Sequence, residues 1–194
     1  MRGFCDALGI EKPIVLGFSF GGFVAQSYAA RHPSHPDKLV LYSTTPVMED
    51  GPVLDAFEAI GGAEVRRVAA AYFAGRTPET TAAFRSICFP LYNTKPWDPD
   101  GVRRGIVNEA VSVRFFEGEG KRMDFRPELK RIACPTLVVA GAKDPRCPLA
   151  FARMMADAIR PELVRLEVFE GCGHGPHIEE PERAMALLRS FIQA

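Results

Sequence analysis

Short apolar runs divide the chain into candidate strands. Four of them are too short for helices, and they span residues 13–17, 38–42, 135–140 and 163–169. The first three are nearly continuous and rich in β-branched residues, which is typical of parallel strands buried on both faces, whereas the fourth alternates like an edge strand. The pattern therefore predicts a parallel sheet of about four strands.

Helical patterns separate or follow these runs. Residues 23–31 form a candidate helix that ends before Pro33, and a second helix repeats apolar residues at i, i+3, i+4, i+7 and i+8 from Phe151. A third begins at Pro181. Because strand and helix alternate, we expect right-handed crossovers between parallel strands. The predicted fold class is α/β.

One interval, residues 46–125, interrupts the alternation. It holds seven of the fourteen phenylalanines and the single tryptophan, without a strand pattern. Helices are indicated by Val65 to Phe73, by Thr77 as an N-terminal cap, and by Asp98-Pro99 opening a further helix through Ala110. The interval is predicted to be an inserted helical lid, although most of its aromatic residues would suit helices that pack a core of their own. The domains expected are a core, 1–45 and 126–194, and a cap, 46–125.

Charge and cysteine content narrow the class of protein. The 194 residues include 24 basic and 24 acidic ones without a basic run, which argues against a nucleic-acid binder and favours a small-molecule partner. The five cysteines are an odd number without a CxxC pair, which favours a reducing compartment over a disulfide framework or a zinc site. No segment has the length of a signal peptide or a membrane span, so we expect a cytoplasmic protein without a membrane partner.

The strongest chemical signal is Gly17-Phe18-Ser19-Phe20-Gly21-Gly22, which lies between a buried strand and a helix. This is the G-x-S-x-G nucleophile elbow in its strand-turn-helix context. A strained turn would lift the hydroxyl clear of the sheet, with glycines two residues before and after Ser19 to avoid collision. The N–H of Phe20, at the helix N-terminus, would then serve the oxyanion hole.

A serine nucleophile needs a base and an orienting acid. Of the four histidines, His174 follows the last strand in a glycine-rich loop at the same edge of the sheet as Ser19, so we expect it to be the base. His177 is the weaker candidate, and His32 and His35 are expected on the surface; a metal pair of His174 and His177 lacks further ligands. Asp144, which follows the third strand, is the expected acid, although an aspartate before proline is also common in solvated turns.

These motifs resemble the α/β-hydrolase family, in particular the branch of proline iminopeptidases and related esterases. The similar stretches are GFSFGGFVAQSYAARHPSHPDKLVLYSTTP, CPTLVVAGAKDPRCP and GCGHGPHIEEPERAMALLRSFI. The resemblance implies Ser19 as nucleophile, Asp144 as acid, His174 as base, no metal and no organic cofactor. We further expect Phe18 and Trp97 to contact the substrate.

The chain also departs from this family. Members carry a half-sheet before the elbow strand, including the loop that supplies a second oxyanion N–H, whereas residues 1–10 resemble the helix that directly precedes that strand. Ile14-Val15-Leu16 would then be a bare apolar strand edge, which is a template for pairing with another chain. We expect either a homodimer through this edge or a piece of a longer protein.

Three functions remain open. The first is hydrolysis of small carboxylic esters through a Ser-His-Asp triad and an acyl-enzyme. The second keeps the triad but cleaves an N-terminal proline amide, with the substrate ammonium held by a cap carboxylate: Glu49, Glu58, Glu64 or Glu109. The third is a catalytically idle fragment that associates through its open edge.

Overall fold

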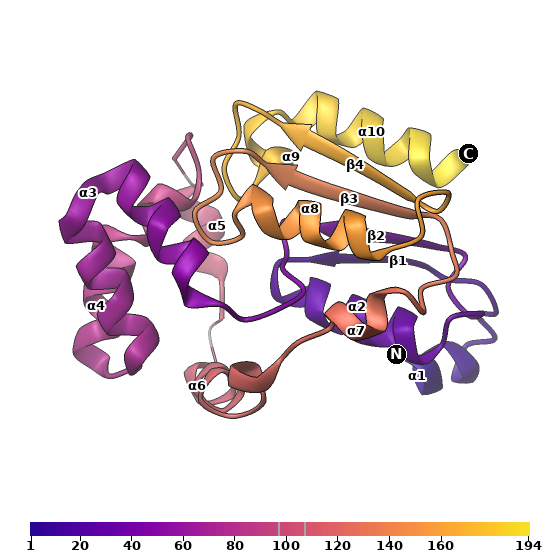
Figure 1. Ribbon diagram of the computed structural model, residues 1–194, viewed down its shortest axis with the longest axis horizontal. Coiled ribbons are helices and arrows are strands. Elements are labelled where there is room, and N and C mark those ends of the chain that lie inside the picture. The colour runs from indigo at the N-terminus through magenta and orange to yellow at the C-terminus, as the bar shows by residue number, and fades with distance from the viewer. Residues whose placement is uncertain (97, 107) are drawn as a thin grey trace.

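A four-stranded parallel sheet forms the centre of the described structure (Figure 1). The computed structural model describes residues 1–96, 98–106 and 108–194, and only the backbone of 99, 102 and 109. The strands are β1 (Ile14–Phe18), β2 (Lys38–Tyr42), β3 (Thr136–Gly141) and β4 (Val164–Phe169), in that spatial order. The predicted strands and the α/β fold class are therefore confirmed.

Helices connect the strands and fill the long interval after β2. In chain order they are α1 (Arg2–Ala7), α2 (Phe20–Arg31), α3 (Asp50–Ala74), α4 (Pro78–Ile87), η1 (Phe89–Tyr92), α5 (Pro99–Arg104), α6 (Glu109–Glu117), η2 (Glu119–Arg122), α7 (Arg126–Leu129), α8 (Leu149–Ala158), α9 (Pro176–Glu179) and α10 (Pro181–Gln193). In the part of the chain that the structure describes, none of them combines the length and apolarity needed to cross a membrane.

The two faces of the sheet are covered unequally. One face packs against α2, α7 and α8, in a core that includes Leu39, Leu41 and Met155. The other face packs against α10 through residues such as Val40. Leu16 pairs with Val40 in register and so lies on the α10 face, yet it is 49% exposed. Of the apolar edge predicted from the sequence, Ile14 and Leu16 are exposed, whereas Val15 is buried.

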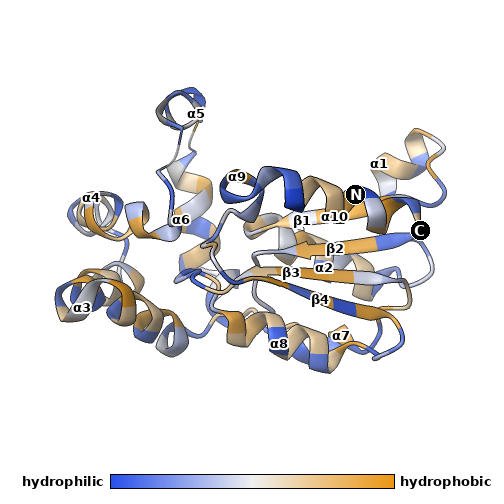
Figure 2. Cartoon of the chain, turned by 90° about the horizontal axis from the view of Figure 1, so that it is seen from above, coloured by the Kyte–Doolittle hydropathy of each residue, from blue (hydrophilic) through white to orange (hydrophobic). Residues whose placement is uncertain are grey.

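Hydropathy distinguishes the strands as the sequence pattern does. In Figure 2, β2 and β3 are largely hydrophobic, whereas hydrophilic residues interrupt β4. Every residue of β3 is buried, while β4 carries the exposed Arg165 and the half-buried Glu167. These charges suit a strand at the edge of a sheet.

The insertion between β2 and β3 contains helices α3 to α6, and its two ends lie side by side. Val47 and Asp124 form an isolated antiparallel bridge, and the N–H of Phe125 donates to the carbonyl of Pro46 at 2.7 Å. Thr77 caps α4 with a reciprocal capping box, as its position predicted. In Figure 1 the arrowheads of β3 and β4 point toward the insertion, so the carboxyl ends of the strands face it.

One predicted helix is wrong in extent. The pattern from Asp98-Pro99 indicated a single helix through Ala110, but α5 ends at Arg104 and α6 begins at Glu109. Ile106, between them, is 99% exposed and offers no packing to continue a helix. Asn108 instead caps α6 by accepting a hydrogen bond from the N–H of Val111 at 3.2 Å.

Candidate active site

Ser19 lies in the tight turn between β1 and α2. Its backbone adopts φ 50° and ψ −117°, a left-handed conformation that costs a non-glycine residue about 1–3 kcal/mol. Hydrogen bonds hold this turn: the N–H of Ser19 donates to the carbonyl of Tyr42 at 2.9 Å, and the Thr44 hydroxyl donates to the carbonyl of Ser19 at 2.9 Å. The serine is only partly buried, as a nucleophile that must meet a substrate requires.

The glycines around Ser19 are needed at positions that differ in part from those expected. A Cβ on Gly17 would lie 2.4 Å from the carbonyl oxygen of Gly21, so the glycine two residues before the serine is required. A Cβ on Gly21 would meet nothing within 4 Å, and the expected collision two residues after the serine is absent among the described residues. The second close approach is instead at Gly22, where a Cβ would lie 2.3 Å from the Thr44 hydroxyl oxygen.

Asp144 lies in the turn that follows β3, and it is only 2% exposed. Its Oδ1 accepts hydrogen bonds from the backbone N–H groups of Arg146 at 2.8 Å and Cys147 at 2.9 Å. Its Oδ2 accepts from Nδ1 of His174 at 2.7 Å. The carboxylate therefore has the fixed position of a turn aspartate while one oxygen holds the imidazole.

His174 is also buried, with 3% exposure, in the loop between β4 and α9. With Nδ1 bound to Asp144, Nε2 is the ring nitrogen left for chemistry. The ring lies 5.0 Å, centroid to centroid, from the ring of Phe18, the residue directly before Ser19. The structure thus bonds His174 directly to Asp144, whereas Ser19 is related to the imidazole through its neighbour Phe18, and among the described contacts its hydroxyl has no hydrogen bond to His174.

The other histidines differ from His174 in their surroundings. The His177 ring lies 5.0 Å from the Phe18 ring and 5.5 Å from the Tyr42 ring, and burial, together with the nearby His174, lowers its pKa. This aromatic environment favours neutral imidazole without a carboxylate to orient it. The surface position expected for His35 is wrong: it is 5% exposed, and its Nδ1 pairs with the Tyr28 hydroxyl because the loop folds back onto α2.

The aromatic residues expected to serve the site have different positions. Phe18 packs between the His174 and His177 rings, so it supports the histidines. Phe20 is the first residue of α2, where the backbone N–H has no acceptor in a preceding helical turn, and its side chain is 46% exposed. Trp97 lies outside the described residues.

A group with metal-ligand chemistry coincides with this site. In the described part of the chain, one potential ligand atom each from Asp144, Cys147 and His174 lies within 4.8 Å of the others. Burial, and then the charge of Asp144, raises the pKa of the Cys147 thiol, so it stays protonated, whereas thiolate is the form that binds metals. The carboxylate and imidazole are already bonded to each other at 2.7 Å. The donor set therefore favours hydrogen bonding over an ion.

Sequence reasoning missed the residues that surround the histidine loop. Tyr92, Asn93 and Glu179 each accept a hydrogen bond from a backbone N–H of residues 173–175. Asn93 and Tyr92 come from the insertion, more than eighty residues earlier, and no local pattern connects them to the loop. The burial of Glu179, 2% exposed, is likewise a tertiary effect.

Comparison with known proteins agrees with this geometry. The sequence model of the family described as alpha/beta hydrolase fold matches residues 1–181. The chain is 27% identical to a proline iminopeptidase of Pestalotiopsis fici, over 95% of this chain and 69% of that one. It is also 27% identical to a pimeloyl-[acyl-carrier protein] methyl ester esterase of Aromatoleum aromaticum, over 100% of this chain and 80% of that one. The solved structure of an Exiguobacterium antarcticum esterase is 25% identical and superposes with a TM-score of 0.71 over 100% of this chain and 71% of its own. The chain is a hydrolase that belongs to the alpha/beta hydrolase fold family.

Proposed function

We propose that the chain hydrolyses small carboxylic esters through a catalytic triad of Ser19, His174 and Asp144. The observation that carries this proposal is the 2.7 Å bond between Nδ1 of His174 and Oδ2 of Asp144. The ring of this imidazole packs against the ring of Phe18, which is the residue directly before Ser19 with its strained backbone. A partly exposed serine hydroxyl, an aspartate and a histidine, in this chain order, are the groups that acyl transfer requires.

In the proposed reaction, the hydroxyl oxygen of Ser19 attacks the ester carbonyl carbon while Nε2 of His174 takes its proton. Asp144 stabilises the imidazolium and fixes the tautomer. The N–H of Phe20 donates to the oxyanion of the tetrahedral intermediate. The imidazolium then protonates the leaving alkoxide, which departs as the alcohol. Water, deprotonated by the same imidazole, attacks the acyl-enzyme and releases the carboxylic acid, and the proton returns to Ser19.

The side chains near Ser19 favour a substrate with an apolar part. The Phe20 ring contacts the rings of Phe23, Phe115 and Phe116 at centroid distances of 5.7, 4.8 and 6.4 Å. Phe20, Phe23 and Phe115 also line an open groove of about 560 Å³ beside α2, although Ser19 and His174 are not among its lining residues. We propose that residues 46–125 act as a lid over the acyl or alcohol group, with Phe18 and Trp97 among the substrate contacts.

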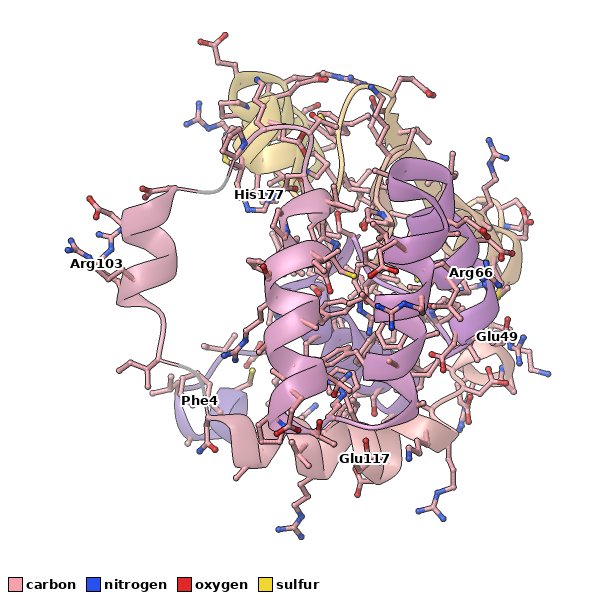
Figure 3. All side chains as sticks on the ribbon, turned by 90° about the vertical axis from the view of Figure 1, so that its left-hand side faces the viewer. Phe4, Glu49, Arg66, Arg103, Glu117 and His177 are labelled. Atoms are coloured by element: carbon pink, nitrogen blue, oxygen red, sulfur yellow. The ribbon has the colours of Figure 1, made fainter. Side chains whose placement is uncertain are left out.

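Cleavage of an N-terminal proline amide is the weaker alternative. It would need a carboxylate beside Ser19 for the substrate ammonium, but three of the candidates are engaged elsewhere: Glu49 with Arg126 at 2.9 Å, Glu58 with Arg66 at 2.9 Å and Glu64 with Arg67 at 2.7 Å. In Figure 3, Glu49 and Arg66 lie well apart from His177, which neighbours the His174 loop. These contacts favour the ester over the amide.

We also propose a homodimer that pairs the β1 edges of two copies. Ile14 and Leu16 of β1 are 40% and 49% exposed, and Phe4 of α1 and Leu8, the residue after α1, are 66% and 60% exposed. A bare apolar strand is a template for such pairing. We further propose a cytoplasmic location, since all five cysteines are free and buried.

The test is hydrolysis of p-nitrophenyl acetate and of proline p-nitroanilide by the wild type and by Ser19→Ala. We expect ester turnover that Ser19→Ala abolishes, with the amide hydrolysed more slowly by at least about 10²-fold. Faster cleavage of the amide would favour the aminopeptidase. Equal ester rates in wild type and variant, or none in either, would refute the proposal and favour the idle fragment.

A further inference from the structure

The loop that carries His174 is held by an unusual number of hydrogen bonds. Three successive backbone N–H groups, those of residues 173, 174 and 175, all donate to fixed acceptors. The N–H of His174 donates to the carbonyl of Tyr92 at 2.6 Å, and the N–H of Gly175 donates to Oδ1 of Asn93 at 2.7 Å. The N–H of Gly173 donates to Oε1 of Glu179 at 2.7 Å.

Glu179 joins this loop to the insertion. Its second oxygen, Oε2, accepts from the N–H of Thr94 at 2.9 Å and also from the Thr94 hydroxyl. Glu179 is 2% exposed, and among the described residues its carboxylate accepts hydrogen bonds only from neutral donors. The ammonium group of Lys95 donates to the backbone carbonyl of Glu179 rather than to the carboxylate. Hydrogen bonds to a buried carboxylate contribute more to stability than neutral ones, so this bridge is rigid.

The loop and the insertion also approach closely enough to exclude a side chain. A Cβ on Gly173 would lie 2.2 Å from the carbonyl oxygen of Tyr92 and 2.8 Å from Cα of Asn93. The Tyr92 ring in addition lies 5.4 Å from the His174 ring. The backbone of the histidine loop is therefore packed directly against residues 92–94.

We propose that Glu179 and Asn93 are positioning residues that fix the His174 imidazole for its bond to Asp144, and that they do so by clamping the histidine loop to residues 92–94 of the insertion. A glycine-rich loop is mobile by default, whereas a general base must keep its place within a fraction of an ångström. The clamp ties the position of the base to the segment of the insertion that ends η1. This inference rests on the proposed triad.

Two variants with matched controls test the clamp. Glu179→Gln keeps the size of the side chain but turns one acceptor into a donor, so it loses the bond to Gly173 or to Thr94. Its control is Glu182→Gln, which changes an exposed glutamate in the first turn of α10. Asn93→Ala removes the side-chain acceptor for the N–H of Gly175. Its control, Asn108→Ala, removes the side-chain acceptor for a backbone N–H elsewhere in the insertion, that of Val111.

Two readouts separate positioning from folding. We expect Glu179→Gln and Asn93→Ala to lower kcat for p-nitrophenyl acetate by about 10²-fold at nearly constant KM, because misplacing a catalytic group slows the chemical step. They should also weaken or remove the far-downfield proton NMR signal of the His174 Nδ1–H bonded to Asp144. Both controls should keep wild-type kcat and this signal, and all variants should still unfold in a single cooperative thermal transition.

Wild-type kcat and an unchanged downfield signal in both variants would overturn the clamp. If Glu179→Gln does not fold, Asn93→Ala decides by the same two readouts. The NMR signal needs no turnover, so it reports on the clamp independently of activity. A Ser19→Ala variant with wild-type activity refutes the triad. An inactive Ser19→Ala beside a fully active Glu179→Gln refutes the clamp alone.

Discussion

The carboxyl edge of the sheet and the free side of β1 belong to the same four strands but contrast in almost every respect. At the carboxyl edge, Asp144 and His174 are buried and bonded to each other, and both Asp144 oxygens have partners. Along β1, Ile14 and Leu16 are exposed, and no described strand pairs with the free side. In the first region the polar groups of Asp144 are paired, whereas the second region has an unpaired strand edge.

The other edge strand shows what a protected edge looks like. On β4, Glu167 pairs with Arg165 and with Arg183 of α10, each at 3.0 Å, so charge discourages further pairing. Among the described residues, no comparable ion pair lies on β1 beside Leu16. The contrast teaches that the chemistry at the carboxyl edge and the association at β1 can be changed independently, and the following predictions test that separation.

The largest effect is expected from Asp144→Asn. The amide can present its NH₂ to His174 and select the wrong tautomer, so kcat for p-nitrophenyl acetate should fall by about 10⁴-fold, without a change in association state. Steady-state kinetics and size-exclusion chromatography with light scattering measure the two quantities. Asp157→Asn, at an exposed position of α8, is the control and should leave both unchanged. A loss below about tenfold in Asp144→Asn would contradict the assigned role.

A smaller loss is expected from Gly173→Ala. Its Cβ would lie 2.2 Å from the Tyr92 carbonyl oxygen, so the loop must shift and carry His174 away, lowering kcat/KM by about 10²-fold. Gly171→Ala is the matched control, because its Cβ would meet only the end of the Glu180 side chain at 3.4 Å. Equal kcat/KM values in the two variants would show that the close approach of Gly173 to Tyr92 does not affect catalysis.

Changes on β1 should affect association and spare catalysis. Leu16→Lys places a charge on the bare edge, so we expect a shift from dimer to monomer in light scattering, with kcat/KM within about twofold of wild type. Arg165→Lys, on the already charged β4, should change neither. A wild-type chain that is monomeric at all concentrations would contradict the proposed dimer.

The smallest effect concerns pH. Burial lowers the pKa of His177, so between that pKa and about 6.5 the unfolded chain binds more protons than the folded one, and stability falls as the pH drops through this window. His177→Gln removes this contribution. Urea unfolding at pH 7 and pH 5 should therefore show a smaller loss of stability in the variant. An equal loss of stability in both proteins would show that a group other than His177 causes the pH dependence.

The sequence predicted what depends on local pattern. The four strands, the turn at Ser19 and the strand ends that carry Asp144 and His174 follow from apolar runs and glycine spacing. The helix break at Ile106 was not predictable, because the apolar spacing does not reveal that this side chain has nothing to pack against. The burial of His35 and the role of Gly22 were not predictable, because they depend on contacts between elements, with Tyr28 of α2 and with Thr44 after β2. Asn93 and Glu179 belong to the same class, since their partners lie across the boundary between insertion and core.

The central claim is that Ser19 becomes acylated with the help of His174. Its most direct test treats the wild type and His174→Ala with diethyl p-nitrophenyl phosphate and maps the adduct by peptide mass spectrometry. We predict one diethylphosphoryl group per chain, on Ser19, in the wild type and slow or no labelling in His174→Ala. An unmodified Ser19 in the wild type, or equal labelling rates in the two proteins, would contradict the proposed mechanism.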